Sequence, residues 1–379
     1  MDVLTILEMV DRNNEGDNRR MNQVFIFILV TLLTFGSTSI QGQGEPKFTE
    51  ILKVPITSIK DQNRSGTCWC YATLGFFEAE VLRKTGRTVD LCEMFVANKD
   101  YMDCAIYHVR MHGDSRFSEG GSADDVLDVL RHHGICPEEA MPLPGTLTGD
   151  SLANFTEFFS LLEPYVEAVA TSKAKKLSPQ WKEGMQAILD AYLGECPTSF
   201  EYEGQMYTPQ TFAASLGLDW DDYVSLTSFT HHPFYESFII EAPYKWRPKP
   251  SLNIPLDTLM ATIDHALEAG YTVCWGGDVS GNGFVRTGIA DTPSHTTPSQ
   301  IGRQIRFDNW DATYDHVMLI YGKAEDQDGR PFYLVKNSWG ESGKYKGTWY
   351  MSRDYIAANT TYIFLNKQAI APNEWSGIH

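Results

Sequence analysis

A short segment near residue 65 contains the residue types of a thiol nucleophile and an oxyanion donor. Gln62 lies six residues before Cys68, and Gly66 provides a turn that delivers Cys68 to the start of an apolar stretch with helical spacing. A thiol at a helix N-terminus feels the positive end of the helix dipole and unpaired N–H groups, which favour the nucleophilic thiolate. The thiol still needs a base, and that base needs a group to hold it in place.

Two later segments could supply the base and its orienting group. His316 opens an apolar, strand-like run, and Asn337 ends another such run 21 residues later, two residues before Trp339. If the turn at 326–329 joins the two runs as neighbouring strands, His316 and Asn337 come together. The Asn carbonyl could then accept a hydrogen bond from the imidazole and fix its tautomer, and the Trp indole could shield that bond.

The elements that must position these residues divide the chain into a helical front and a strand-rich back. Apolar spacing and capping signals predict helices at 68–83, from Ser122 to Gly134 with Asp125 as capping partner, at 151–196 in two pieces divided near 177–179, and at 256–269. Alternating patterns predict strands at 271–275, 316–321, 332–336 and 348–351, and residues 46–61 look extended. This order predicts an α+β protein of two lobes with a site in the cleft between them.

Composition excludes several classes of function. The chain has 379 residues, 31 Lys and Arg against 49 Asp and Glu, and a net charge of −18. Such an acidic balance argues against nucleic acid or an anionic membrane surface as a partner. Seven cysteines are too few for a disulfide scaffold, and their odd number requires at least one thiol that is free or paired with another molecule.

The N-terminus has the pattern of a secretory signal. The uncharged apolar run 24–35 follows Arg19 and Arg20 and precedes small and polar residues, and it is too short for a comfortable membrane span. We therefore expect a signal region at 1–44, with Met21 as an alternative start, and an exported protein, periplasmic or extracellular, that is free of the membrane after cleavage. Cleavage near Gly44 would remove 3 basic and 5 acidic residues and leave a charge of −16.

The three segments, in this order, resemble the papain-like cysteine peptidases, through Gln-x5-Cys-Trp, Asp-His-Val and Asn-Ser-Trp-Gly. The spacing of 248 residues from Cys68 to His316, together with the stretches 107–122 and 222–229, resembles the bleomycin hydrolase and aminopeptidase C branch. The resemblance covers roughly residues 50–370. It implies a papain-like two-lobed fold with a helical lobe and a β-barrel-like lobe, a peptidase domain at 45–370, and a helical insertion at about 145–255.

Carried over residue by residue, the resemblance assigns the chemistry. Cys68 attacks the scissile carbonyl, His316 exchanges the proton, Asn337 orients His316, and Gln62 donates to the oxyanion, so that an acyl-enzyme forms and water hydrolyses it. The resemblance also places Gly120 and Gly121 against the substrate backbone. It adds Trp339 as a shield at the substrate site, and it implies peptide or protein substrates with no cofactor or metal.

The resemblance leaves the mode of cleavage and the assembly open. In this branch the C-terminus lies in the cleft and limits cutting to the substrate N-terminus, so the tail at 371–379 predicts aminopeptidase-like trimming, with endopeptidase activity as the alternative. A catalytically silent binding protein on the same fold is a third reading, which the intact catalytic positions argue against. A homo-oligomer is a further option that the branch suggests.

Other polar residues have plainer explanations. His108 and His112 have the spacing of a zinc helix but lack the intervening Glu, and the pairs His132-His133 and His231-His232 look like surface or cleft residues. Cys70 is expected in the core, and Cys92 could pair with Cys104 in an oxidising compartment. The 326–329 segment resembles the start of a calcium loop, but a hairpin turn explains it better.

Overall fold

Helix α3 (Cys68–Thr85) and strand β10 (His316–Asp326) are in contact at the centre of the fold. The computed structural model describes residues 46–141, 153–292 and 298–371. α3 is buried on most of its faces because it contacts β10 on one side and α4 (Glu93–Arg110) and α5 (Ala123–His132) on the others. It ends at Gly86, whose φ of 73° is a left-handed conformation that costs glycine little.

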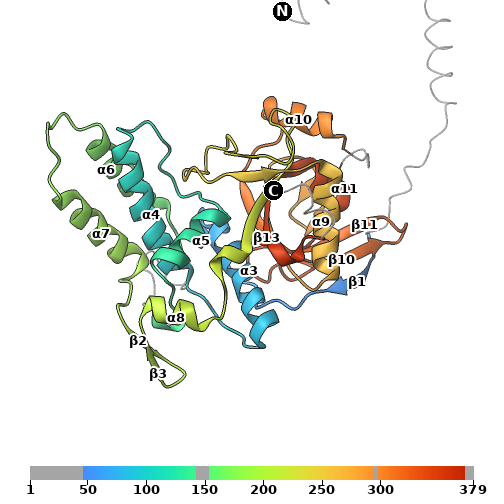
Figure 1. Cartoon of the computed structure of the whole chain (residues 1–379), viewed down its shortest axis with the longest axis horizontal. Coiled ribbons are helices and arrows are strands. Elements are labelled where there is room, and N and C mark those ends of the chain that lie inside the picture. The colour runs from blue at the N-terminus through green and yellow to red at the C-terminus, as the bar shows by residue number, and fades with distance from the viewer. Residues whose placement is uncertain (1–45, 142–152, 293–297, 372–379) are drawn as a thin grey trace, which may run out of the picture. The chain divides into compact units, whose positions relative to one another are not determined.

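The helical lobe packs around α3, α4 and α5. The described residues of the predicted 151–196 segment contain two helices as predicted, and Pro179 precedes the second, where its fixed φ suits a helix start. A two-stranded hairpin and a short helix follow. The elements added here are α6 (Thr156–Ala170), α7 (Gln180–Leu193), β2 (Phe200–Tyr202), β3 (Gln205–Tyr207) and α8 (Pro209–Ser215). In Figure 1 they gather on the left of the view, away from the large sheet.

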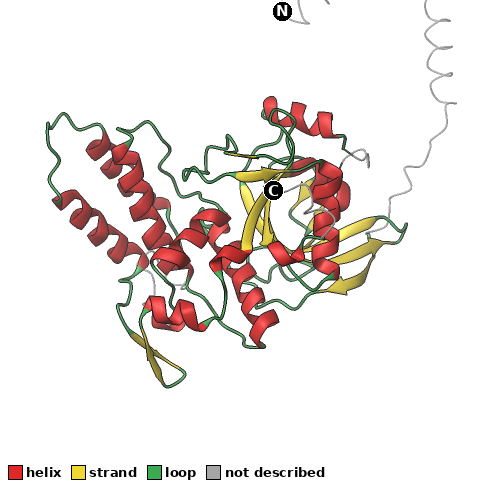
Figure 2. Ribbon diagram, viewed as in Figure 1, coloured by secondary structure: helices red, strands yellow, loops and turns green. Residues whose placement is uncertain are grey.

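The second lobe is built on a mostly antiparallel sheet of eleven strands. Ten strands follow one another in the order β5 (Ser237–Phe238), β6 (Ser251–Asn253), β4 (Tyr223–Thr227), β13 (Thr360–Asn366), β7 (Val273–Gly277), β10, β11 (Pro331–Lys336), β12 (Thr348–Ser352), β9 (Ile289–Ala290) and β8 (Phe284–Val285). β1 (Phe48–Lys53) pairs with the later half of β10. α9 (Leu256–Glu268) contacts β10 and β7, and α11 (Arg353–Asn359) contacts β12. Figure 2 shows the strands gathered in this lobe.

The predicted α+β, papain-like two-lobed architecture is confirmed, with one correction. The strand-rich lobe is not a closed barrel: among the described residues, β5 and β8 end the sheet and do not pair with each other. Strong twist and short edge strands can give a sheet a barrel-like curvature without closure. The last strands of the segment expected as an insertion, β4 to β6, join this large sheet.

Most of the helices and strands that short sequence patterns predicted are present in the structure. α5 begins with the predicted capping box, in which Asp125 accepts hydrogen bonds from the Ser122 backbone N–H at 2.7 Å and hydroxyl at 2.8 Å. The hairpin turn after β10 is also as predicted, since Asp326 accepts from the backbone N–H groups of Asp328 and Arg330, both at 2.9 Å. α4, α10 (Gln300–Asp308) and β13 were not predicted.

Two predictions fall largely outside the described residues. The signal region 1–44 lies there entirely, and so does the tail except Ala371. In the part of the chain that is described, no helix is both long and apolar enough to cross a membrane.

Candidate active site

Cys68 is the first residue of α3, and it lines a pocket of about 470 Å³ that His316 and Gln62 also line. The loop before α3 is held by short local bonds, including Ser65 Oγ to the Gln62 carbonyl at 2.8 Å. Because Cys68 begins α3 and His316 begins β10, the first residues of these two elements lie at the same pocket. The sequence prediction that Cys68, His316 and Gln62 share one site agrees with this geometry.

The hairpin of β10 and β11 brings His316 to Asn337. Leu319 pairs with Lys336 across the hairpin, and His316 Nε2 lies 2.9 Å from Asn337 Oδ1. Asn337 Oδ1 also accepts the backbone N–H of Ser338 at 2.8 Å. Because that N–H can only donate, the oxygen must be on this side of the amide, and His316 Nε2 must donate to it. His316 Nδ1 is then the ring nitrogen with a lone pair free to accept a proton.

Trp339 lies over the His316–Asn337 pair. The Trp339 and His316 rings have centroids 5.0 Å apart at an interplanar angle of 34°. Trp349 and Phe284 meet the indole edge-on, at 5.5 and 5.9 Å, and hold it in place. The indole also lines the pocket, and its roles as a shield and at the substrate site stay predictions.

The Gln62 side chain is fixed at both of its polar atoms. Its Nε2 donates to the Ser65 carbonyl at 2.6 Å, and its Oε1 accepts the Ser338 hydroxyl at 2.6 Å. The backbone adds a bond from Gln62 N–H to the Ser338 carbonyl at 2.9 Å. One N–H of the amide remains for the pocket. The sequence did not predict the role of Ser338, because only the fold brings it to Gln62.

Burial sets the charge state of the two reacting groups. It raises the pKa of Cys68 to about 12, although backbone N–H groups of Val317 and Trp69 favour the thiolate. It lowers the pKa of His316 to about 4, although the bond to Asn337 opposes this. Desolvation of the buried thiol therefore works against the helix N-terminus, which the sequence prediction expected to favour the thiolate. Both shifts favour the neutral forms, thiol and imidazole, so the proposed chemistry needs a proton transfer from Cys68 to His316.

Gly120 and Gly121 line the pocket, and packing explains why neither position can carry a side chain. A Cβ on Gly121 would lie 2.8 Å from Trp69 Cδ2, and a Cβ on Gly120 would lie 2.4 Å from Tyr244 Cδ1. Both rings therefore rest directly on this backbone. The glycine pair forms a smooth wall between Trp69 of α3 and Tyr244 of the later segment.

Three acidic residues in the pocket were not predicted. Glu119 accepts the Gly66 N–H at 2.5 Å, and its pKa is raised by burial, against that bond, and further by the charge of Glu163. Burial also raises the pKa of Asp315, next to His316, to about 6. No sequence signal marks Glu163, since it comes from α6.

The remaining candidates have mainly structural partners. His108 contacts Ser115 Oγ and Glu167 Oε2, each at 3.1 Å, and so has partners other than His112. All seven cysteines are free thiols, so Cys92 and Cys104 do not pair, and Cys70 is fully buried as expected.

Comparisons with known proteins find a matching family, similar sequences and a similar fold. A sequence model described as the peptidase C1-like family matches residues 90–378, which include His316 and Asn337 but begin after Cys68. Aminopeptidase C of Lactobacillus delbrueckii subsp. lactis is 22% identical over 87% of this chain and 84% of its own length. Aminopeptidase E of Lactobacillus helveticus is 23% identical over 84% and 82%. The crystal structure of PepW from Lactobacillus rhamnosis HN001 superposes with a TM-score of 0.72 at 22% identity, covering 87% of this chain and 84% of that one.

Proposed function

The chain belongs to the peptidase C1-like family, and from this premise we propose that it is a cysteine aminopeptidase that uses Cys68 as its nucleophile. The family makes it a papain-like cysteine peptidase. The observation that carries the assignment of residues is the single pocket lined by Cys68, His316 and Gln62, with His316 Nε2 bonded to Asn337 Oδ1.

In the proposed mechanism His316 Nδ1 accepts the thiol proton as Cys68 Sγ attacks the substrate carbonyl carbon. The thiolate–imidazolium state has the same number of protons as the neutral thiol–imidazole pair, so proton transfer within the site needs no outside base. His316 then protonates the leaving amine as the C–N bond breaks and a thioester remains on Cys68. Water attacks the thioester, His316 takes one proton from it, and the acid product leaves as the proton returns to sulfur.

Gln62 stabilises the charge that develops on the carbonyl oxygen. Its remaining amide N–H and the backbone N–H of Cys68 are the two proposed donors, and the donor role of the amide requires it to be fixed beforehand. The 2.6 Å bonds to Ser65 and Ser338 provide that fixation. Such donors lower the barrier and contribute little to substrate affinity, since the charge exists only in the transition state.

Names of the relatives and the charge of the pocket support N-terminal trimming. Aminopeptidases C, E and G are among the relatives that the chain matches over more than four fifths of its length. Glu119 and Glu163 bring negative charge into the pocket, which suits the α-ammonium group of a free peptide N-terminus. The tail at 371–379, by resemblance to the bleomycin hydrolase branch, would block longer substrates on that side.

Export is a separate proposal that rests on the pattern of residues 19–44 alone. The protein would then trim peptides outside the cytoplasm, and N-terminal sequencing of the protein purified from its native source would locate the cleavage. A mature N-terminus near Gly44 supports export, and a protein that retains residues 24–35 contradicts it.

Cleavage of paired peptides tests the proposed activity. We expect release of single residues from peptides with a free N-terminus and little or no cleavage of the same peptides after N-acetylation. Equal cleavage of both sets, at internal bonds, would replace the aminopeptidase assignment with an endopeptidase. A Cys68→Ala variant, which should be inactive on both sets, controls for contaminating peptidases.

A further inference from the structure

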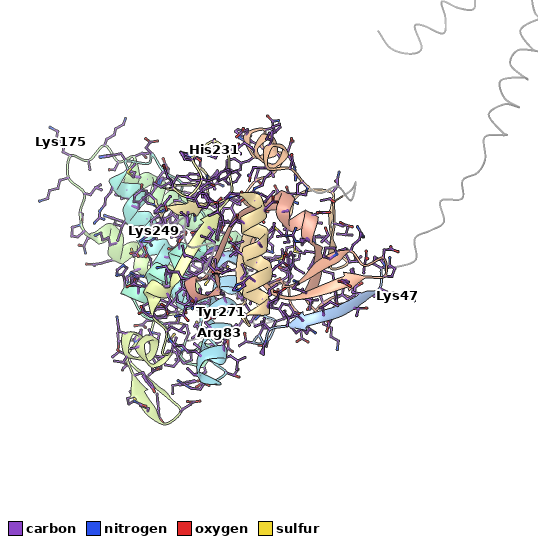
Figure 3. The ribbon with its side chains drawn as sticks, turned by 45° about the vertical axis from the view of Figure 1, so that its right-hand side comes forward. Lys47, Arg83, Lys175, His231, Lys249 and Tyr271 are labelled. Carbon is purple, nitrogen blue, oxygen red and sulfur yellow. The ribbon has the colours of Figure 1, made fainter. Side chains whose placement is uncertain are left out.

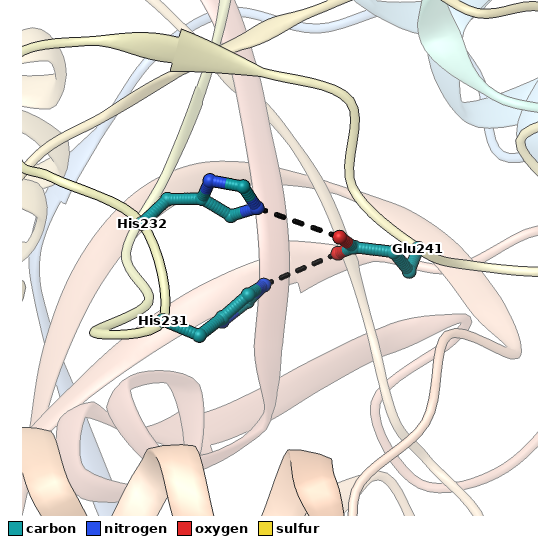
Figure 4. Close-up of side chains that lie close together, drawn as sticks. All are labelled: His231, His232 and Glu241. Atoms are coloured by element: carbon teal, nitrogen blue, oxygen red, sulfur yellow. Dashed lines mark hydrogen bonds and ion pairs between the residues drawn. The ribbon is translucent and has the colours of Figure 1, made fainter.

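Outside the proposed active site, we propose that His231, His232 and Glu241 form a binding site for a zinc ion. One ligand atom from each residue can be chosen so that all three atoms lie within 4.8 Å of one another. His231 Nε2 is 3.1 Å from Glu241 Oε2, and His232 Nε2 is 3.4 Å from Glu241 Oε1. Figure 4 shows both imidazoles facing the carboxylate from one side.

His231 and His232 are adjacent in the sequence, yet both of their side chains contact Glu241. Successive side chains of a strand point to opposite sides, so His231 and His232 could not share a partner there. Here residues 230–232 form a bend, which turns both rings toward Glu241. Figure 3 places His231 near the surface of the molecule, where an ion can reach it.

The bend is fixed from beneath by a buried asparagine. Asn253 Nδ2 donates to the carbonyls of Phe229, His232 and Pro233, at 2.8, 2.9 and 3.1 Å. Asn253 Oδ1 accepts the Phe229 N–H at 2.9 Å, and Asn253 is completely buried. Both histidines therefore stand on a braced loop, which lowers the entropy cost of bringing them to one ion.

The rings themselves are also held. The His232 ring stacks on Phe238 at a centroid distance of 4.1 Å, and His231 meets the same ring edge-on at 5.3 Å. His231 Nδ1 lies 3.0 Å from Gln304 Nε2 and 3.2 Å from Gln304 Oε1, the oxygen that also accepts the Thr230 N–H at 2.6 Å. Metal binding through His231 Nε2 requires the tautomer with the proton on Nδ1, which would donate to Oε1 as the second ring nitrogen of a metal-bound histidine commonly does.

The donor set matches the chemistry of zinc. Two imidazoles and one carboxylate with a water molecule complete a tetrahedral site, with metal–ligand distances of about 2.0–2.2 Å and ligand atoms about 3.3 Å apart. The two His–Glu distances are already close to that separation. The three ligand atoms lie within 4.8 Å of one another, and rotation of the partly exposed side chains would bring them to one ion. The strongly acidic surface of the chain favours cations in general.

Bound zinc would fasten the loop that contains strand β5. His232 precedes β5 and Glu241 follows it, so one ion closes this edge of the sheet. Glu241 is also three residues before Tyr244, whose ring rests on Gly120 in the wall of the catalytic pocket. A second pocket, of about 570 Å³, is lined by residues that include Glu241, Tyr244 and Tyr314.

Zinc titration of the full chain carrying Cys68→Ser tests the proposal, because the serine removes the proposed catalytic thiol as a competing ligand. We expect the Cys68→Ser chain to bind zinc, and we expect it to bind one equivalent less when H231N, H232N or E241Q is added. Affinity at that site should fall by at least about 10-fold, because loss of a ligand should cost no less than the 10–100-fold typical of a lost supporting partner. The control H132N removes another exposed histidine and should leave binding unchanged.

Cobalt(II) supplies a second readout. The same protein with Co²⁺ should give intense visible bands of a tetrahedral site without the near-ultraviolet band of a thiolate ligand, and H232N should lose them. Equal melting temperatures of the metal-free variants would show that they fold. The proposal is wrong if the Cys68→Ser chain binds no zinc. It is also wrong if each of the three single-ligand variants binds as much zinc, as tightly, as the Cys68→Ser chain itself.

Discussion

Replacing Gln62 by alanine removes one of the two proposed oxyanion donors and leaves the other, the Cys68 backbone N–H. The amide is fixed by 2.6 Å bonds to Ser65 and Ser338, so its free N–H can act without reorganisation. Loss of a preorganised donor of this kind typically lowers kcat by about 10²–10³, or about 2.7–4 kcal/mol. KM should change little, since the donor acts on charge that exists only in the transition state.

Two controls make this prediction specific. Ser338→Ala keeps the Gln62 amide but removes one orienting bond, worth about 0.5–1.5 kcal/mol, so kcat should fall by roughly 2–10-fold. Alkylation of Cys68 by iodoacetamide forms no oxyanion, so its rate should be unchanged in Gln62→Ala. Steady-state kinetics on an aminoacyl amide and the alkylation rate are the two measurements. A loss of kcat below tenfold, or an equal loss in alkylation rate, would refute the oxyanion role.

Four further predictions follow from the site. Asn337→Ala removes the bond to the imidazolium, worth about 1.5–3 kcal/mol, and should lower kcat/KM by roughly 10–150-fold; an effect below threefold would contradict the orienting role. Burial lowers the pKa of His316 to about 4, so kcat/KM should hold down to about pH 5. It should fall as the pH drops through 4, because the protonated ring can no longer accept the thiol proton. An acid limb of the pH profile near pH 6.5 would contradict this. Glu163→Gln should raise KM for peptides with a free N-terminus more than for N-acetylated ones, and equal changes would remove its proposed role. Truncation after Ala371 should release cleavage of N-acetylated peptides while Cys68 alkylation is kept, and unchanged N-terminal preference would exclude the tail as a block.

Local patterns predicted the parts of the fold that depend on near neighbours. Gly86 ends α3, Asp125 caps α5, and the turn at 326–329 forms the hairpin that joins His316 to Asn337. Each of these is decided by residues a few positions apart or by one tight turn. The catalytic candidates could be predicted for the same reason, since each occurs in a short segment of recognisable residue types.

The features of the fold and the site that the sequence did not predict depend on contacts between distant segments. Helix α4 was missed because it is buried on several sides, so its apolar spacing is irregular. The sequence did not predict the upward shift of the Cys68 pKa, because the burial that causes it comes from packing of α3 against distant segments. Glu163 reaches the pocket and Ser338 reaches Gln62 from elements far away in the chain, and Glu241 meets His231 across strand β5.

Labelling with an epoxysuccinyl thiol reagent tests the central claim most directly. Cys68 lines the pocket, whereas Cys70, two residues later, is fully buried and bonds the Glu93 carbonyl at 3.5 Å, so it serves as an internal control. Under reducing conditions, peptide mapping by mass spectrometry should find one label per chain, on Cys68, with activity lost in proportion to labelling. A native enzyme that stays active when Cys68 is fully modified, or a Cys68 that does not react, would contradict the account.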